Sequence, residues 1–285
     1  MNLYGLTTGT VMTDNRKQAL CQEFTDLEIE YFRNNGFIKV DNLFPLDVID
    51  LISTEIRSSD ALKTSDGAIF DTIENKRELR YVPRPHIILP SFQKLVNSNV
   101  LHLSSKLLNE PVYFVGIDLH CRAAGTDIPT PPHQDSFLFC FEPGFESMVT
   151  CYISMGDMNS ETASLRFIKG SHLLPTLEHK QSKVRGFSSV IEEHANLLSK
   201  EIIQDEEIIS LKKGECVFFH SKTIHYTNQA TKPTIGRTSV SIRIGGYNMR
   251  YSAERQRKYK EFVAYNREST IREGLTSTIP KPQHI

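Results

Sequence analysis

The sequence lacks the charge excess and the long apolar runs that mark several classes of protein. Its 33 basic and 34 acidic side chains nearly cancel, so no basic surface predicts a nucleic-acid partner. No apolar run reaches the ~18 residues that a membrane-spanning helix needs. We therefore expect neither nucleic-acid nor membrane binding, and a small molecule as the partner.

Cysteine is sparse, and the five cysteines form no Cys-x-x-Cys pair. An odd and scattered set argues against a disulfide framework and predicts buried thiols in a reducing compartment. The segment 1–20 lacks the apolar core of a secretory signal. These absences together favour a cytoplasmic location.

Internal repeats, low-complexity tracts and domain-splitting linkers are also absent from the sequence. A chain of 285 residues can bury a large core as one unit. We therefore expect a single domain over residues 1–285. Residues 1–24 show little periodicity and are expected to form a loose N-terminal arm.

The first part of the chain carries helix signals. Thr25 can cap a helix that ends before Gly36, and a short alternating strand should follow it. Pro45 opens a second helix with an apolar stripe. Residues 90–108 suit one or two further helices, whereas residues 60–86 are polar, rich in arginine and expected to be irregular.

From residue 112 onward, short apolar segments alternate with turn signals. Strands are expected at 112–122, 148–155, 165–168, 208–211, 216–219, 224–227 and 238–244. A helix and loop at 185–205 should interrupt them, and a charged helix at 252–265 should close the domain. This spacing is typical of a jelly-roll sandwich or barrel within a mainly β, α+β domain.

Two of these strands have one polar and one apolar face. Positions 237, 239, 241 and 243 are arginine or serine, whereas the positions between them are threonine, valine or isoleucine. The segment 112–122 shows the same period of two, with Asp118, His120 and Arg122 on the polar face. In a barrel with helix-backed walls, the polar face should point inward.

A histidine and a carboxylate stand one residue apart at His133 and Asp135. On an extended segment they project from the same face, and imidazole with carboxylate suits a divalent first-row metal. An isolated His-x-Asp is more often a surface pair, so a further ligand is needed. Either His220 or His225 could supply it, leaving three positions open on an iron.

The motifs in order resemble the phytanoyl-CoA dioxygenase family of Fe(II)- and 2-oxoglutarate-dependent oxygenases. They are His-Gln-Asp at 133–135, Leu-Arg-Phe-Ile-Lys-Gly-Ser-His at 165–172, Ile-His at 224–225 and Arg237. The resemblance covers roughly residues 25–250. It implies a double-stranded β-helix (jelly-roll) core at about 112–246, flanked by N-terminal and C-terminal helices.

The resemblance also implies roles for individual residues. His133, Asp135 and His225 would be the catalytic Fe(II) ligands, which favours His225 over His220. Arg237 would bind the far carboxylate of 2-oxoglutarate. Three further residues are expected at the cosubstrate: Ser239, Gln134 and Arg122. The alternative for Arg237 is an ordinary strand salt bridge.

Arg243 and His120 also lie on the polar faces of these strands. Arg243 lies on the same face as Arg237 but roughly 20 Å farther along the strand, so we expect it to be structural. His120 suits a site-lining role and a structural role about equally.

The implied activity is hydroxylation of an unactivated C–H in a small metabolite, with consumption of O2 and release of succinate and CO2. Desaturation, epimerisation or cyclisation would use the same oxidant. A carboxylate at Asp135 argues against halogenation, because related halogenases have a small residue there. A cupin-like metal protein without 2-oxoglutarate and a non-catalytic binding protein are alternatives, which Arg237 and the triad argue against.

The arginine-rich stretch at 76–86 precedes the expected barrel. Arg80 and Arg84 could seat a carboxylate or phosphate of the substrate, because prolines hold the end of the stretch extended. The alternative is a solvated surface loop whose arginines pair with Glu74 and Glu78.

Overall fold

Helix α1 (Asp26–Asn35) and strand β1 (Phe37–Val40) show how local sequence signals set the first elements. The Thr25 hydroxyl accepts from the Glu28 N–H at 3.3 Å, and the Glu28 carboxylate accepts from the Thr25 N–H at 2.8 Å. This capping box satisfies two backbone donors at the helix start. Gly36 ends the helix with φ of 85°, which glycine adopts without strain. Both predicted elements are confirmed.

The computed structural model describes residues 22–73, 75–125, 129–182, 189–191, 205–232 and 236–272. Most of the predicted N-terminal arm lies outside these residues, and so does most of the helix and loop predicted at 185–205. Within the described parts of the chain, no helix has both the length and the apolarity that crossing a membrane requires.

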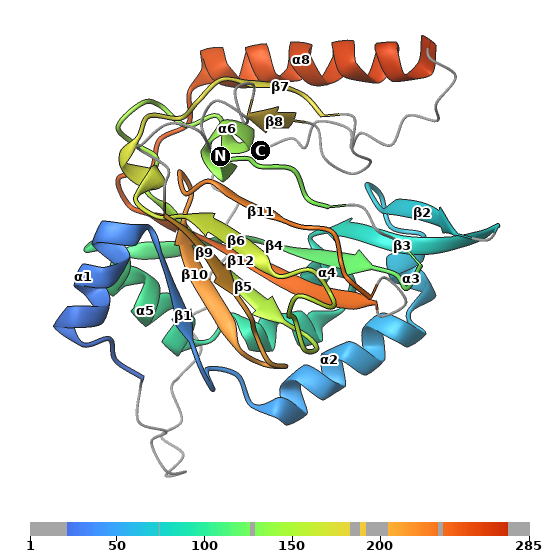
Figure 1. Ribbon diagram of the computed structural model, residues 1–285, viewed down its shortest axis with the longest axis horizontal. Coiled ribbons are helices and arrows are strands. Elements are labelled where there is room, and N and C mark those ends of the chain that lie inside the picture. Colours follow the sequence, from blue (N-terminus) through green and yellow to red (C-terminus); the bar gives the residue numbers. More distant parts are fainter. Residues whose placement is uncertain are drawn as a thin grey trace, which may run out of the picture.

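Seven strands form one large antiparallel sheet in the order β1-β10-β5-β12-β4-β3-β2. Beyond β1, its strands are β10 (Cys216–His220), β5 (Met148–Ser154), β12 (Arg237–Gly246), β4 (Val112–Arg122), β3 (Lys76–Pro83) and β2 (Ile69–Ile73). The long strands β12 and β4 run side by side at its centre (Figure 1).

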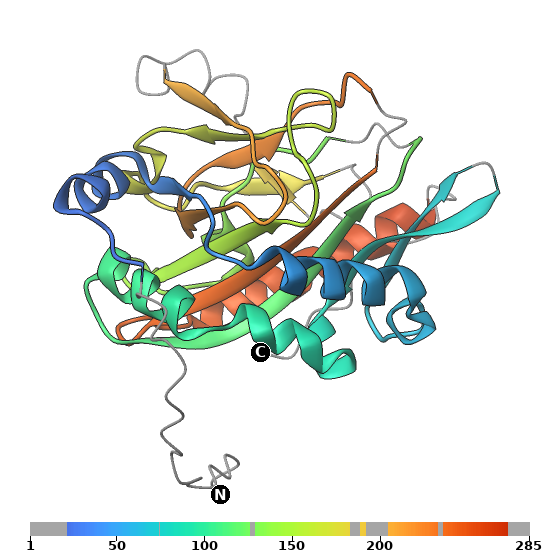
Figure 2. The same ribbon diagram turned by 90° about the horizontal axis from the view of Figure 1, so that it is seen from below.

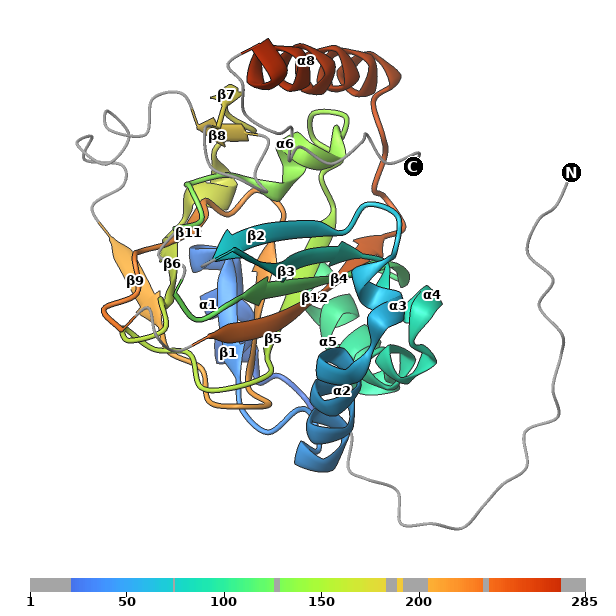
Figure 3. The ribbon, with the colours of Figure 1, turned by 90° about the vertical axis from the view of Figure 1, so that its right-hand side faces the viewer.

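A smaller sheet faces the large one. It has the order β11-β6-β9, with β11 (His225–Thr227), β6 (Leu165–Ile168) and β9 (Glu206–Ile209). The segment at His133 pairs with the free side of β11 through an isolated bridge. Figure 3 shows the small sheet on one side of the large sheet and helices on the other. This is the predicted double-stranded β-helix, and the fold prediction is confirmed.

Helices cover the outer face of the large sheet (Figure 2). They are α2 (Leu46–Ser58), α3 (Asp60–Lys63), α4 (Pro85–Ile88), the 3-10 helix η1 (Pro90–Leu95) and α5 (Ser98–Leu108). Ile49 and Ile52 of α2 and Leu103 of α5 pack in one buried cluster with Leu119 of β4 and Ile242 of β12. All five are fully buried, so this interface is the main hydrophobic core.

The opposite face of the large sheet is polar along β4, β12 and β5, as the period of two predicts, whereas β1 and β10 meet the small sheet through an apolar cluster that includes Phe37 and Phe219. Directly opposite residues on antiparallel strands point to the same side. The cross-strand pairs on this side are Arg237 with Arg122, Ser239 with His120 and Ser154, Ser241 with Asp118 and Tyr152, and Arg243 with Thr150. These polar side chains lie on the face toward the small sheet, so the space between the sheets is polar beside β4, β12 and β5.

The stretch at 60–86 is ordered, which corrects the prediction of an irregular segment. It forms α3, the hairpin β2–β3 and the start of α4. The register slips beside Ile69, so that Arg80 and Tyr81 of β3 both lie against this one residue of β2. Such a bulge changes which face a side chain takes. The charged composition concealed a hairpin at the end of the sheet, where β2 is the edge strand and edge strands tolerate charge.

Two helices lie on the remaining side of the barrel (Figure 1). The short α6 (Asp135–Phe139) starts at Asp135, and α8 (Ala253–Arg272) passes over it and over the hairpin β7 (His179–Gln181) and β8 (Ser189–Ile191). Asp135 is therefore the first residue of a helix and not part of a regular strand. Gln134 before it is still extended, with φ of −120° and ψ of 130°.

The predicted free thiols are confirmed among the residues that the structure describes. Cys121, Cys140, Cys151 and Cys216 are unbridged, and all but Cys121 are buried. Cys21 lies outside the described residues.

Truncation of Ile242 should test the core between the sheet and the helices. We expect Ile242→Val to lower the free energy of unfolding by about 0.5–1.5 kcal/mol and Ile242→Ala by about 2–5 kcal/mol. Urea unfolding of both variants measures this. Equal, negligible effects would show that the helix layer does not pack on this face.

Candidate metal centre and active site

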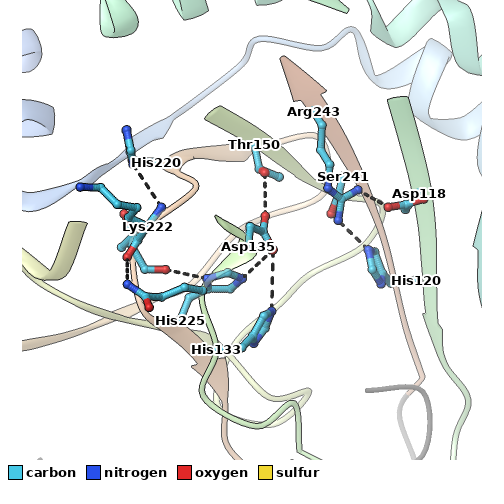
Figure 4. A network of polar contacts seen from close by, with 12 residues as sticks. Asp118, His120, His133, Asp135, Thr150, His220, Lys222, His225, Ser241 and Arg243 are labelled. Atoms are coloured by element: carbon cyan, nitrogen blue, oxygen red, sulfur yellow. Dashed lines mark hydrogen bonds and ion pairs between the residues drawn. The ribbon is translucent and has the colours of Figure 1, made fainter. Parts of the chain in front are cut away.

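Three side chains converge between the two sheets (Figure 4). The Oδ1 atom of Asp135 lies 3.9 Å from Nε2 of His133 and 4.0 Å from Nε2 of His225. Their ligand-type atoms all lie within 4.8 Å of one another, and all three residues are buried. Because these separations exceed hydrogen-bond length, the imidazoles do not bond to the carboxylate, and a cation fits between them.

Backbone pairing holds the two histidines together. The His133 N–H donates to the His225 carbonyl at 3.2 Å, and the His225 N–H donates to the His133 carbonyl at 3.1 Å. This reciprocal pair brings the residues directly opposite each other, so their side chains share one face. The ring centroids are only 4.2 Å apart.

A backbone carbonyl fixes the tautomer of each histidine. His133 Nδ1 lies 2.8 Å from the Pro131 carbonyl, and His225 Nδ1 lies 2.9 Å from the Thr223 carbonyl. A carbonyl only accepts hydrogen bonds, so Nδ1 carries the proton in both rings. Each Nε2 therefore keeps its lone pair, which is the arrangement that orients histidine ligands in metal sites.

Asp135 is held from its other side. The Thr150 hydroxyl of β5 donates to Asp135 Oδ2 at 3.0 Å, which leaves Oδ1 toward the histidines. Burial alone would raise the pKa of the carboxyl. The positive Arg243, the two histidines and the Thr150 hydrogen bond outweigh it, so the pKa of Asp135 is lowered overall. The group is therefore a carboxylate at neutral pH.

Burial keeps both histidines neutral. It lowers the pKa of His133 to about 4, with a further contribution from His225. Burial also lowers the pKa of His225, although Asp135 opposes the shift. Two neutral imidazoles and one carboxylate are a donor set that suits a divalent first-row metal.

His220, the other candidate ligand, lies outside this group. Its Nδ1 accepts a hydrogen bond from the Lys222 N–H at 3.1 Å, and its ring neighbours His172 at 5.7 Å between centroids. Burial and the charges of these neighbours lower its pKa to about 3. The structure thus brings His225, and not His220, to His133 and Asp135.

Arg237 lies at the start of β12. One nitrogen donates to the Ala163 carbonyl and to the Met158 sulfur at 3.4 Å. Among the residues that the structure describes, no acidic side chain pairs with it. Nearby, the hydroxyls of Ser239 and Ser164 are buried and find no hydrogen-bond partner in the described chain. A cation and two unsatisfied hydroxyls fit the carboxylate of a bound anion.

Arg122 and Gln134, the other two residues expected at the cosubstrate, differ in their position relative to Arg237. Arg122 is buried and sits directly opposite Arg237 in the β4–β12 pair, which suits the predicted role at the cosubstrate. The amide nitrogen of Gln134 donates to the Lys222 carbonyl and its oxygen accepts from the Leu177 N–H, each at 2.8 Å. Both ends of the Gln134 amide thus join the ligand segment to backbone groups of two distant segments.

Sequence reasoning missed Thr150 and the effect of Arg243 on Asp135. Arg243 is ion-paired with Asp118 on the polar face, and its charge acts on Asp135 as well. The signal for Thr150 was present, because Thr150, Tyr152 and Ser154 are the polar residues of an otherwise apolar strand at a period of two.

The two substrate candidates in the arginine-rich stretch lie in different surroundings. Arg80 is buried at the bulge of β3 and pairs with Asp71 at 3.2 Å, so it is not part of a solvated loop. Arg84 is exposed, with φ of 51°, and its N–H donates to the Ile117 carbonyl at 2.9 Å. The structure therefore does not bring them together as one anion seat.

Comparison with known families and structures places these observations in context. The family model described as phytanoyl-CoA dioxygenase (PhyH) matches residues 32–234. No curated protein matches the sequence.

Several solved structures share the fold. The epimerase SnoN in complex with Fe3+, alpha ketoglutarate and nogalamycin RO is 18% identical, with a TM-score of 0.63, and the match covers 79% of this chain and 84% of that one. EctD from S. alaskensis with 2-oxoglutarate and 5-hydroxyectoine is 16% identical, with a TM-score of 0.63 over 78% and 76%. The alpha ketoglutarate dependent carbocyclase SnoK is 15% identical, with a TM-score of 0.62 over 90% and 93%.

Alanine substitutions should show whether His225 or His220 is the third Fe(II) donor. We expect His225→Ala to abolish tight Fe(II) binding, because it removes one of three donors. His220→Ala should largely spare it. Anaerobic titration with Fe(II) measures both. The opposite ranking would mean that the third donor is misassigned.

Acid should destabilise the metal-free protein through its buried histidines. Burial lowers the pKa of His120, His133 and His179 to about 4 and that of His220 to about 3. The unfolded chain takes up these protons near pH 6.5 and the folded chain does not. Stability present above pH 6.5 should therefore fall toward pH 4, by up to about 1.4 kcal/mol per pH unit for each histidine.

Urea unfolding at several pH values measures this slope. His220→Gln removes one of the groups and should make the slope shallower. An unfolding free energy that stays constant from pH 7 to pH 5 would contradict the assignment of neutral buried rings.

Proposed function

This chain belongs to the phytanoyl-CoA dioxygenase family, and on that premise we propose that it is an Fe(II)- and 2-oxoglutarate-dependent dioxygenase that hydroxylates a small-molecule metabolite. The observation that carries the proposal is the convergence of His133, Asp135 and His225 with their Nε2 and Oδ1 atoms toward one point. Every other polar atom of these three groups is tied to the protein.

The three residues would hold one Fe(II) from a single face, and the remaining face would be open to cosubstrate and O2. Bound together, iron and 2-oxoglutarate supply an oxidant for an unactivated C–H bond, with release of succinate and CO2. The residues of the chain contribute position and electrostatics. The Pro131 and Thr223 carbonyls orient the two imidazoles, and Thr150 orients the carboxylate.

Arg237 would bind the far carboxylate of 2-oxoglutarate, because guanidinium offers parallel donors that match a carboxylate. Ser239 and Ser164 would give that carboxylate the hydrogen bonds that their buried hydroxyls otherwise leave unmade. Arg122, opposite Arg237 in the sheet, adds positive charge at the same place. Like charges side by side favour an anion between them.

The type of product that the oxidant would form is a separate part of the proposal. A carboxylate at Asp135 occupies the position that a halide would need, which supports hydroxylation over halogenation. Epimerisation and ring closure are alternative outcomes of the same oxidant, since the solved structures of similar fold include an epimerase and a carbocyclase. A metal protein that does not use 2-oxoglutarate is disfavoured by Arg237, which has no acidic partner among the described residues, and by the unsatisfied buried hydroxyls of Ser239 and Ser164.

Polar groups of the substrate would meet the wall of the barrel. Arg80 is on the bulge of β3 beside Tyr81, and the Tyr81 ring lies 5.4 Å from the His120 ring between centroids, with 53° between the planes. The ion pair between Arg80 and Asp71 reduces the attraction of Arg80 for an anion. Arg84 remains a candidate contact from the exposed turn before α4.

Loss of Arg237 should separate recognition of the far carboxylate from recognition of the 2-oxo acid. Arg237→Ala should weaken 2-oxoglutarate binding by on the order of 2–5 kcal/mol, measured by titration of the metal-loaded protein. It should leave 2-oxobutyrate, which has no second carboxylate, nearly unchanged. Arg243→Ala should keep the preference for 2-oxoglutarate. Loss of that preference in Arg243→Ala alone would contradict the assignment.

Succinate release tests the reaction class directly. We expect Fe(II)-dependent succinate formation from 2-oxoglutarate, stimulated by the true substrate within a panel of carboxylated, phosphorylated and cyclic metabolites. A chelator should abolish it. Metal binding without any 2-oxoglutarate turnover across the panel would favour the cupin-like alternative.

A further inference from the structure

One backbone group in the ligand segment has a side-chain partner from far along the chain. The N–H of Gln134, which stands between His133 and Asp135, donates to Nε2 of His179 at 3.2 Å. His179 opens strand β7, 45 residues later. The peptide group between His133 and Gln134, one of the two that separate His133 from Asp135, is thus held by an imidazole that is not itself in the metal group.

The tautomer of His179 is fixed in the orientation that this bond needs. Its Nδ1 lies 2.8 Å from the Leu177 carbonyl, which only accepts, so Nδ1 carries the proton and Nε2 is an acceptor. The side chain is buried, and burial lowers its pKa to about 4. The ring therefore stays neutral and accepting at physiological pH.

The ring is also fixed by stacking. It lies 4.1 Å from the ring of Phe137, with 14° between the planes. Phe137 belongs to α6, the helix that begins at Asp135. Tyr259 and Phe262 of α8 meet the Phe137 ring edge-on at 5.9 and 6.0 Å between centroids. His179 is therefore packed directly against the helix that carries Asp135.

The side chain of Gln134 is also held, by hydrogen bonds to two different segments. The Leu177 N–H donates to Gln134 Oε1, and Gln134 Nε2 donates to the Lys222 carbonyl, both at 2.8 Å. Lys222 lies three residues before His225. The segment 177–179 and the segment before β11 thus hold Gln134 from opposite sides.

We propose that His179 is a positioning residue of the metal centre, which fixes the Gln134 peptide and thereby sets the spacing of His133 and Asp135. The inference rests on the proposed function, because it takes these residues as metal ligands. Rotation of this peptide would move the two donor atoms relative to each other, and metal sites tolerate displacements of only about 0.5 Å. Supporting groups of this kind typically change metal affinity by about 10–100-fold.

A matched pair of variants separates positioning from packing. His179→Phe keeps an aromatic ring against Phe137 but removes the acceptor, so we expect Fe(II) affinity to fall by about 10–100-fold. His179→Gln places an amide oxygen near the former Nε2 and should recover most of the loss. Anaerobic Fe(II) titration of folded protein measures both.

His172 provides the control. It is another buried histidine, and its Nε2 donates to the Arg33 carbonyl at 3.0 Å in α1, away from the ligand segment. His172→Gln should lower thermal stability without weakening Fe(II) binding. Fe(II) affinity unchanged in His179→Phe, or equally poor in His179→Phe and His179→Gln, would overturn the positioning role.

The hydrogen bond itself can be observed without metal. We expect a scalar coupling between the amide nitrogen of Gln134 and Nε2 of His179 in nitrogen-15 NMR of the wild type, and slow exchange of the Gln134 amide. The exchange should become fast in His179→Phe and stay slow in His179→Gln. Absence of the coupling would overturn the inference.

The two proposals fail differently. If the wild type binds no Fe(II), the proposed function fails and the positioning role fails with it. If the wild type binds Fe(II) and His179→Phe binds it equally well, only the positioning role is lost.

Discussion

The reciprocal backbone hydrogen bonds between His133 and His225 are the constraint on which the site depends. They join the segment before α6 to β11, and they place two imidazoles on one face because directly opposite residues in an antiparallel pair share a side. With both Nδ1 atoms donating to carbonyls, only the placement of Asp135 remains to be set. Thr150 sets it from the large sheet, so the site spans both sheets.

The two faces of the large sheet differ along its central strands β4, β12 and β5. Its apolar face packs against α2 and α5 in the main core, and its polar face carries Arg237, Ser239 and Arg243 toward the small sheet. A polar face inside a barrel costs free energy wherever hydroxyls and charges stay unpaired. A bound 2-oxo acid would offset part of this cost by accepting hydrogen bonds from the unsatisfied hydroxyls near Arg237.

Local and periodic features of the fold could be predicted from the sequence. The Thr25 cap, the Gly36 stop and the alternation in β12 each depend on residues that are close in sequence. The hairpin β2–β3 could not be predicted, because its charged strands lack that alternation. No sequence pattern indicated a role for His179, because its hydrogen bond to the Gln134 N–H spans 45 residues. The hydrogen bonds of Gln134 could not be predicted for the same reason, because its partners lie on two distant segments.

The central claim is that two imidazoles and one carboxylate of this chain hold a single iron. X-ray absorption at the iron edge of the protein loaded with Fe(II) and 2-oxoglutarate tests it most directly, because multiple scattering counts coordinated imidazoles. The account predicts one iron with two imidazoles and an otherwise oxygen-only shell. A shell with fewer than two imidazoles, or with a sulfur ligand from one of the cysteines, would contradict it.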